Sequence, residues 1–226
     1  MDSRVVKDTL YEQLARIGKA VSSPQRLEML DLLAQGEKSV EALAAATGLM
    51  VKNTSAHLRV LREAQLVEVR KESQYAYYRL AGQDVSAFLL AIRDLAENRL
   101  AEVREVSRQY FGGRERMTSV DRKRLMQRMR AGEVIVIDVR PAAEFEAGHI
   151  PGARSVPLAE LRKTLKSIPR DQEVVAYCHG PYCVLAVEAV RLLRASGYSA
   201  TRLDDGITEW KSGGLPITQG RSEQAS

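Results

Sequence analysis

Two cysteines, Cys178 and Cys183, are the only thiols of the 226-residue chain, and they lie five positions apart. Two cysteines are too few for a disulfide framework, so their closeness in sequence indicates a single chemical site. Cys178 ends an apolar run that is typical of a buried strand, and Cys183 opens a segment with helical spacing. A thiol at the N-terminus of a helix has a lowered pKa, and its thiolate is a nucleophile. The spacing therefore predicts a reactive sulfur site between a strand and a helix.

The residues between the cysteines are suited to hold an anionic sulfur atom. The loop reads Cys178, His179, Gly180, Pro181, Tyr182 and Cys183. Gly180 lets the backbone curl, Pro181 suits an early helix position, and a protonated His179 adds positive charge. We expect Cys178 to carry a persulfide and Cys183 to act as a resolving thiol, which closes a disulfide or a polysulfide bridge. Simple burial of Cys183 on the helix is the alternative that the pattern leaves open.

The histidine and cysteine content disfavours a metal site. The chain has three histidines, which are His57, His149 and His179. Two cysteines and one histidine within one loop are fewer ligands than a tetrahedral zinc site needs. We therefore expect neither a metal ion nor any other cofactor.

The second half of the chain alternates between strand and helix patterns, which predicts an α/β domain with a parallel sheet covered on both faces. Apolar runs predict strands at 134–139, 173–178 and 201–203, and helical spacing predicts helices at 184–195 and 208–211. The predicted elements place Cys178 at the end of a strand and Cys183 at the start of a helix. We expect this domain to cover residues 114–220, with a flexible tail at 221–226.

Helical spacing dominates the first half and predicts a mainly α domain over residues 1–113. The predicted helices cover residues 5–21, 24–35, 40–47, 51–64 and 82–110. Residues 67–80 alternate in polarity and are rich in β formers, which predicts a hairpin. Two short helices joined by a glycine-containing turn form a helix-turn-helix, and the hairpin that follows makes it a winged one.

A winged helix-turn-helix places its second helix in the major groove of DNA. The side chains expected to contact DNA from this helix are Lys52, Asn53, Ser55, Ala56 and Arg59. At the hairpin tip, the side chains expected near backbone phosphates are Arg70, Lys71 and Gln74. The net charge is +5, and residues 50–79 hold six basic and three acidic side chains, where this interpretation needs positive charge. A second basic segment, residues 114–130, is expected to link the domains.

Four segments of the first half match one known family: SPQRLEMLDLL (23–33), SVEALA (39–44), SAHLRVLREA (55–64) and YAYYRL (75–80). Through them, nearly all of residues 5–110 resembles the ArsR family of winged-helix repressors. The resemblance implies a homodimer, built by the first helix and by residues 83–110, that binds an inverted repeat in double-stranded operator DNA. Relatives that sense metals use cysteines or histidines, but residues 40–44 contain no cysteine and residues 84–110 no histidine. This half therefore carries no recognisable sensor.

Segments of the second half match another family: VIDVR (136–140), EF (144–145), GHIPGA (148–153), VAYC (175–178) and residues 203–216. Residues 118–217 thereby resemble the rhodanese family. The resemblance implies an α/β fold, Cys178 as the nucleophile that accepts sulfur, and loop N–H groups at 179–183 that stabilise the bound sulfur. Asp138, Arg140 and His149 match the family pattern and are expected to have structural roles. Val184 stands where many relatives have a basic residue, which disfavours a dianionic donor such as thiosulfate.

We interpret the chain as a homodimeric transcriptional repressor whose rhodanese-like domain senses reactive sulfur species or another thiol-reactive small molecule. Neither a membrane span nor a secretory signal is found in the sequence, so we expect a cytoplasmic protein. The first alternative is an enzyme, a sulfurtransferase or arsenate reductase that carries a DNA-binding domain, with Cys178 as nucleophile. The second is a rhodanese-like domain that serves only for dimer contacts.

Overall fold

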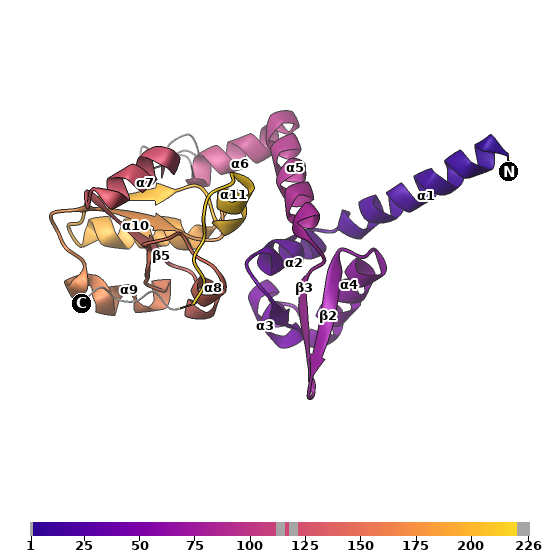
Figure 1. Cartoon of the computed structure of the whole chain (residues 1–226), viewed down its shortest axis with the longest axis horizontal. Helices are drawn as coiled ribbons and strands as arrows, with labels where there is room; N and C mark the ends of the chain where they lie inside the picture. The colour runs from indigo at the N-terminus through magenta and orange to yellow at the C-terminus, as the bar shows by residue number, and fades with distance from the viewer. Residues whose placement is uncertain (1, 112–115, 118–121, 221–226) are drawn as a thin grey trace. The chain divides into compact units, whose positions relative to one another are not determined.

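The computed structural model describes residues 2–111, 116–117 and 122–220 and divides into two compact units (Figure 1). The first unit is Met1–Ile92 and the second is Arg93–Ser226. The predicted boundary between residues 113 and 114 and the predicted tail at 221–226 lie outside the described residues.

The first unit is a helical domain with a small antiparallel sheet. Its elements are α1 (Ser3–Val21), α2 (Pro24–Ala34), β1 (Lys38–Ser39), α3 (Val40–Thr47), α4 (Val51–Glu63), β2 (Val67–Glu72), β3 (Tyr75–Leu80) and the first part of α5 (Gln83–Arg99). Ser39 begins α3, because its Oγ accepts a hydrogen bond from the amide of Ala42 at 3.2 Å. Gly48 ends α3 with a φ of 67°, a conformation that favours glycine. The predicted hairpin is confirmed by the antiparallel pairing of β2 with β3 (Figure 1).

Apolar side chains of α2, α3 and α4 form the core of the first unit. The fully buried ones are Met29, Leu30, Leu43, Leu58 and Leu61. Each buried side chain of this size contributes about 1.5–3 kcal/mol to folding. Because Leu58 and Leu61 fix the inward face of α4, its opposite face is left in solvent.

The helix predicted at 82–110 is interrupted at Leu100, which separates α5 from α6 (Ala101–Phe111). The guanidinium of Arg104 donates hydrogen bonds to the carbonyl oxygens of Glu97 and Asn98, at 2.9 and 3.1 Å. These carbonyls belong to the last turn of α5, where the helix supplies no amide partner. Arg104 therefore caps α5, and the prediction of one continuous helix is wrong at this point.

Among the described residues, no helix is long and apolar enough to cross a membrane.

The second unit contains a parallel five-stranded sheet with strand order β4-β8-β7-β5-β6. After α6, its elements are β4 (Arg116–Met117), α7 (Arg122–Arg130), β5 (Val134–Asp138), α8 (Ala142–Ala147), β6 (Arg154–Ser155), α9 (Leu158–Thr164), the 3-10 helix η2 (Leu165–Ser167), β7 (Glu173–Tyr177), α10 (Val184–Ala195), β8 (Ala200–Leu203) and α11 (Ile207–Ser212). The predicted strands correspond to β5, β7 and β8. Strands β4 and β6 have two residues each, which is too short for a periodic pattern.

From residue 122 onward, the basic segment predicted as a linker is a packed helix, α7. Leu125 of this helix is fully buried in the second unit. The guanidinium of Arg122 donates to Asp205 at 2.7 Å, and that of Arg128 donates to Glu173 at 2.8 Å. These arginines of α7 therefore balance carboxylates of their own unit, which corrects the expectation of a linker for residues 122–130.

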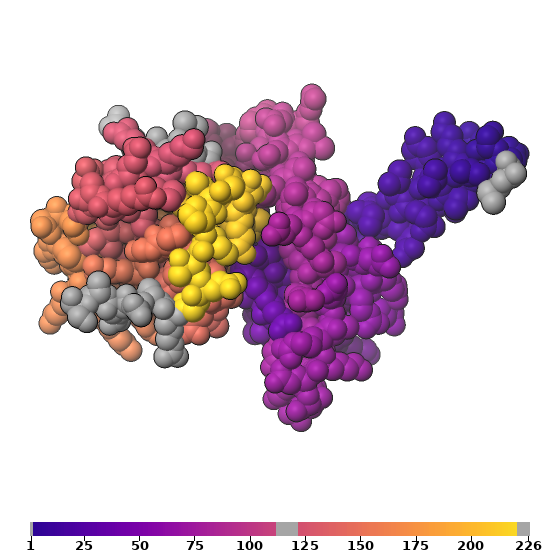
Figure 2. Space-filling model, viewed as in Figure 1, coloured from indigo at the N-terminus to yellow at the C-terminus, as the bar shows by residue number. Residues whose placement is uncertain are grey.

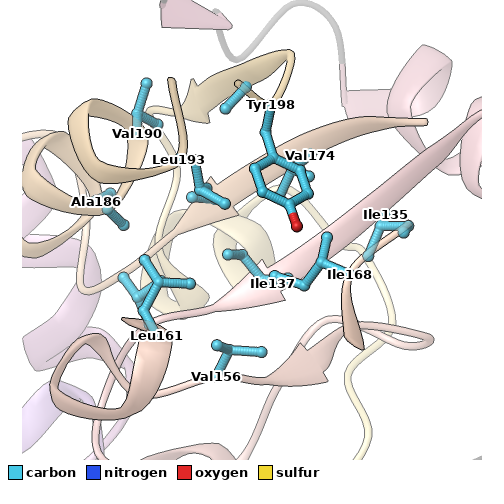
Figure 3. Packing of buried hydrophobic residues seen from close by; sticks show 14 of the residues in the cluster. Ile135, Ile137, Val156, Leu161, Ile168, Val174, Ala186, Val190, Leu193 and Tyr198 are labelled. Atoms are coloured by element: carbon cyan, nitrogen blue, oxygen red, sulfur yellow. The ribbon is translucent and has the colours of Figure 1, made fainter. Parts of the chain in front are cut away.

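Alternate residues of β5 point to opposite faces of the sheet and build two buried clusters. Ile135 and Ile137 belong to the cluster between the sheet and helices α9 and α10, which Figure 3 shows. Val134 and Val136 belong to the cluster on the other face, with side chains of α7, α8 and α11. Cys178, directly after β7, belongs to the first cluster and is 1% exposed. The sheet is thus covered on both faces, as predicted.

A buried ion pair fixes the end of β5. The side chains of Asp138 and Arg140 are completely buried, with Arg140 Nη2 at 2.6 Å from Asp138 Oδ2. The same Nη2 donates to the carbonyl oxygen of Gly148 at 2.7 Å, and the Arg140 amide donates to Asp138 Oδ1 at 3.0 Å. Asp138 and Arg140 therefore join the end of β5 to the segment that follows α8, in agreement with the structural roles expected for them.

Replacing Asp138 with asparagine is expected to destabilise the second unit, because Arg140 becomes a buried cation without its counter-charge. Breaking a buried pair in this way costs about 3–5 kcal/mol. Trp210, the only tryptophan and fully buried, reports urea denaturation of this unit by fluorescence. Glu105→Gln is the control, because Glu105 and Arg108 form an exposed pair on α6, and its midpoint should match the wild type. Equal midpoints for the two variants would contradict this role.

Candidate functional site

The two cysteines lie at the two ends of one short loop. Cys178 follows β7, and Cys183 is the N-cap residue of α10. The loop turns through a hydrogen bond from the Cys183 amide to the Gly180 carbonyl oxygen at 3.1 Å. Both cysteines are free thiols, and Cys178 Sγ lies 3.7 Å from the carbonyl oxygen of Cys183. The structure thus places the two thiols together between a strand and a helix, as their spacing predicts.

His179 connects Cys183 to a buried carboxylate. Its Nδ1 lies 3.3 Å from Cys183 Sγ, and its Nε2 lies 2.6 Å from Glu144 Oε2 on α8. The side chains of His179 and Glu144 are 18% and 9% exposed. Burial lowers the pKa of His179, but its hydrogen bonds to Cys183 and Glu144 outweigh burial and raise that pKa to about 9. His179 is therefore an imidazolium at neutral pH, with each N–H directed at one of these two partners.

Sequence reasoning does not find Glu144 as a site residue. Glu144 lies 35 positions before His179, and only the fold brings the two together. The one available signal is an acidic residue beside Phe145 on a short helix, and this pattern is common on helix surfaces. Glu144 is instead buried, and its contact with His179 accounts for a carboxylate in that position.

The two thiols have opposite electrostatic environments. Burial raises the pKa of the Cys178 thiol well above its usual value, although the amides of Ala186 and Gly180 oppose this shift. Hydrogen bonds from the Cys178 thiol and from His179 lower the pKa of Cys183 to about 4, against the effect of burial. The position of Cys183 at the N-terminus of α10 acts in the same direction. Of the two thiols, Cys183 is therefore the more acidic.

The start of helix α11 packs against the backbone of the loop. A Cβ atom on Gly206 would lie 2.0 Å from the carbonyl oxygen of His179, so the two backbones are in direct contact. The Gly206 amide donates to Glu209 Oε2 at 2.9 Å, and Glu209 forms an ion pair with Arg93 of α5. The side chains of Arg93 and Glu209 are 15% and 11% exposed. A nearly buried ion pair thus joins α5 to the helix that supports the loop.

The centre of the loop also contacts residues of α5 and α6 that belong to the second unit. The hydroxyl of Tyr182 donates to Glu97, and the Arg93 guanidinium lies 5.4 Å from the centre of the Tyr182 ring. The Phe111 and Tyr182 ring centres are 6.0 Å apart. The guanidinium of Arg202 donates to the Pro181 carbonyl oxygen at 2.9 Å. A movement of Tyr182 therefore has to break contacts with α5 and α6.

The side chains predicted to contact DNA lie on the surface of the first unit. Those from α4 are all exposed, and they are Lys52, Asn53, Ser55, Ala56 and Arg59. Lys71 and Gln74 are exposed at the hairpin, whereas Arg70 forms ion pairs with Glu37 and Glu72 at 2.8 and 2.5 Å. The structure therefore brings the α4 side chains together on one helix, while two carboxylates already neutralise Arg70.

Helix α1 presents apolar side chains to solvent. They are Val5, Val6, Leu10, Tyr11 and Leu14, and each is at least 40% exposed. Figure 2 shows α1 extending from the other helices of its unit. An apolar face of this size on one helix is typical of an interface with another protein surface.

Two family models match the chain, and together they span most of it. The model described as "Bacterial regulatory protein, arsR family" matches residues 23–69, and the model described as "Rhodanese-like domain" matches residues 121–213. The chain is 45% identical over 214 residues to the HTH-type transcriptional regulator Rv0324 of Mycobacterium tuberculosis, covering 95% of this chain and 94% of the relative. It is 33% identical over 103 residues to a sulfurtransferase of Allochromatium vinosum, covering 45% of this chain and 94% of the relative.

Solved structures match each half separately. One is the solution structure of a homodimeric winged helix-turn-helix DNA-binding domain from Mycobacterium bovis, described as a possible ArsR-family transcriptional regulator. That domain is 43% identical with a TM-score of 0.41, covering 45% of this chain and 92% of that one. Another is a rhodanese-related protein from Thermoplasma volcanium, 27% identical with a TM-score of 0.40, covering 46% of this chain and 97% of that one.

Gly206→Ala is expected to displace the loop between Cys178 and Cys183, because the new methyl group would overlap the carbonyl oxygen of His179. The φ of Gly206 is −96°, which alanine adopts freely, so the effect arises from the overlap alone. Overpacking of this kind lowers the stability of the folded state by about 1–3 kcal/mol. The unfolding temperature of this unit, measured by Trp210 fluorescence, should therefore fall. Gly18→Ala is the control, since nothing lies within 4 Å of its added Cβ. An unchanged unfolding temperature for Gly206→Ala would show that the loop does not contact α11.

Proposed function

The chain belongs to the HTH-type transcriptional regulators of the arsR family that carry a rhodanese-like domain, and from this premise we propose that it senses reactive sulfur species through Cys178 and Cys183. The reduced form binds operator DNA as a homodimer, for which the exposed apolar face of α1 provides an interface. Reaction of the cysteine pair with sulfur then releases the DNA. The membership itself confirms the two family resemblances inferred from the sequence.

The observation that carries this proposal is the pairing of two free thiols with unequal acidity in one loop. The more acidic thiol supplies a thiolate, and the other thiol is hydrogen-bonded to it. A thiolate starts sulfur exchange, and a neighbouring thiol completes it, so the pair contains both groups that a reversible sulfur switch needs.

The chemistry is a two-electron oxidation of the pair by an inorganic polysulfide. The thiolate attacks one sulfur of the polysulfide dianion, an S–S bond breaks, and a polysulfide shorter by one sulfur leaves with two negative charges. The product is a cysteine persulfide anion. The second thiol attacks the inner sulfur of that persulfide and forms a disulfide, and the outer sulfur leaves as hydrosulfide with the proton of the second thiol. One further sulfur transfer before closure gives a polysulfide bridge instead.

Helix α5 provides the path from the loop to the DNA-binding unit. Val85 and Leu89 of α5 are buried in the core of the first unit. On the same helix, Arg93 and Glu97 contact the supporting helix α11 and the loop residue Tyr182. Allostery requires that the protein binds DNA with a different affinity in each of the two states of the loop. We propose that bridging of the cysteines moves Tyr182 and thereby changes the position of α5.

Fluorescence anisotropy with DNA from upstream of the protein's own gene tests the proposal. Polysulfide treatment is expected to weaken binding about 5–150-fold, the usual range of allosteric coupling, and dithiothreitol should restore it. Cys178→Ser and Cys183→Ser should bind DNA like the reduced wild type and stay bound after polysulfide treatment. Release of Cys178→Ser from DNA to the wild-type extent would overturn the mechanism.

A catalytic function is the second candidate, because the chain is 33% identical to a sulfurtransferase that it covers almost completely. Turnover distinguishes an enzyme from a sensor. An enzyme that contains this pair transfers many equivalents of sulfur from polysulfide to a thiol acceptor. A sensor reacts once per protein and then waits for a reductant. Sulfide release measured at substoichiometric protein concentration separates the two.

Lys52→Ala is expected to weaken binding to all DNA sequences to a similar degree, because we propose that this exposed lysine of α4 contacts a backbone phosphate. The slope of the logarithm of the association constant against the logarithm of salt concentration should fall by about 1. Lys166→Ala removes the same charge from an exposed position in the second unit and serves as control. Equal salt slopes for the two variants would exclude a phosphate contact by Lys52.

A further inference from the structure

The basic segment at residues 114–130 holds seven basic and two acidic side chains. Both acidic residues, Glu115 and Asp121, lie outside the described residues. Helix α7 carries five of the seven basic residues, which are Arg122, Lys123, Arg124, Arg128 and Arg130. The described part of the segment is therefore a strongly cationic helix on the second unit.

Two of the α7 cations are neutralised within their own unit. Arg122 pairs with Asp205, and Arg128 pairs with Glu173 and Glu133. The other three, Lys123, Arg124 and Arg130, are exposed and form no ion pair with any described residue. The unit thus balances only part of the charge of α7.

The packing of α7 turns its unpaired cations toward solvent. An α-helix turns by about 100° per residue, so Lys123, Gln127 and Arg130 share one face, and Leu125 lies on the opposite one. Leu125 is fully buried against the sheet, whereas the three residues on the other face are exposed. The buried leucine therefore fixes which side of the helix a partner can reach.

An open hollow beside the end of α7 extends this cationic surface to the edge of the sheet. Arg130 of α7 and Arg154 of the edge strand β6 both line the hollow, and its lining contains no carboxylate. Arg154 is exposed and forms no ion pair with any described residue. We name this surface the α7 face and define it by its four unpaired cations, which are Lys123, Arg124, Arg130 and Arg154.

The charge of α7 opposes the stability of the helix itself. The N-terminus of a helix is the positive end of its dipole and favours acidic side chains. The first turn of α7 instead contains Arg122, Lys123 and Arg124 and no acidic residue. Asp205 compensates Arg122, but Lys123 and Arg124 repel each other without a described partner. A sequence that breaks a local stability rule in this way indicates a functional site.

The composition of the α7 face favours a phosphate polyanion over a protein surface. Protein interfaces are centred on apolar and aromatic side chains. The large hydrophobic side chains exposed on the described chain include none from α7 or β6. Arginine and lysine are the side chains that most often bind DNA phosphates. Because the second unit is tethered to a DNA-binding unit, it meets DNA phosphates at a high effective concentration.

We propose that the α7 face is a second DNA-contacting surface, which binds backbone phosphates without contacting base edges. The first unit selects the DNA sequence, and the α7 face adds affinity that is independent of sequence. This inference goes beyond the sulfur switch, because it requires DNA binding by the first unit but neither Cys178 nor Cys183.

Fluorescence anisotropy of the reduced full chain, on DNA from upstream of its own gene, tests this surface over a series of salt concentrations. The triple variant Lys123→Gln/Arg130→Gln/Arg154→Gln removes three cations of the α7 face. Each lost phosphate contact lowers the slope of the logarithm of the association constant against the logarithm of salt concentration by about 0.9. The slope should therefore fall by about 2–3 for each bound chain, and affinity should fall more at about 50 mM than at about 200 mM salt.

The matched control is Arg162→Gln/Lys163→Gln/Lys166→Gln, which removes three exposed cations from α9 and η2. Helices α7 and α9 cover opposite faces of the sheet (Figure 1), so the control has the same net charge and an intact α7 face. Its salt slope should match the wild type. Both variants should keep the wild-type unfolding midpoint by Trp210 fluorescence, because exposed substitutions change stability by about 0.5 kcal/mol at most.

A reduced slope for the α7-face variant alone supports the second surface. Equal slopes for the two triple variants overturn it and leave an acidic protein surface as the partner that this charge would fit. The sulfur switch fails or stands separately. Wild-type protein that polysulfide releases from DNA keeps the sensor even if the slopes are equal. A reduced slope together with DNA binding that is insensitive to polysulfide keeps the α7 face and rejects the sensor.

Discussion

The parallel pairing of β5, β7 and β8 is the constraint on which the second unit depends. Parallel strands end at the same edge of a sheet, so the segments after these three strands meet there. Asp138 ends β5 and Arg140 follows it, the cysteine loop follows β7, and Gly206 follows β8. Arg140 of the buried ion pair holds the Gly148 carbonyl oxygen directly after α8, and α8 is the helix that carries Glu144. Gly206 contacts the backbone of the cysteine loop. The chemistry of the loop is therefore a product of the sheet rather than of its six residues alone.

Charge pairing explains how this edge can hold so many ionisable groups away from solvent. Arg140 with Asp138 and Arg202 with Asp204 are almost completely buried, and each cation has its anion two positions away in sequence. Arg122 with Asp205 and Arg93 with Glu209 join elements that are distant in sequence. Buried charges are tolerated only when they are paired and hydrogen-bonded. Within the described residues, Cys183 and His179 follow the same rule, and the proposed reaction with sulfur removes one of their two charges.

The sequence predicts the parts of the structure that depend on local pattern. Helical spacing, the serine and glycine at the ends of α3, and the alternation of residues 67–80 are sufficient for the winged helix-turn-helix. The strand before Cys178 and the helix after Cys183 are equally local. The break at Leu100 is capped by one arginine that donates to two carbonyl oxygens, and the hydrophobic periodicity does not predict it. Glu144 and the buried face of α7 become apparent only in three dimensions, because their partners are far away in the chain. The relative acidity of the two cysteines has the same origin.

The burial of Cys178 has a consequence for the size of any bridge. Its side chain belongs to a cluster that includes Ala186, Ala189 and Val190 of α10, and all of them are at most 1% exposed. Protein interiors are packed as densely as organic crystals, so a sulfur atom inserted into this cluster displaces the side chains around it. In the proposed bridge, each additional sulfur atom then moves the start of α10 away from the sheet. In the proposed bridge, the packing of this cluster therefore limits the number of sulfur atoms between the two cysteines.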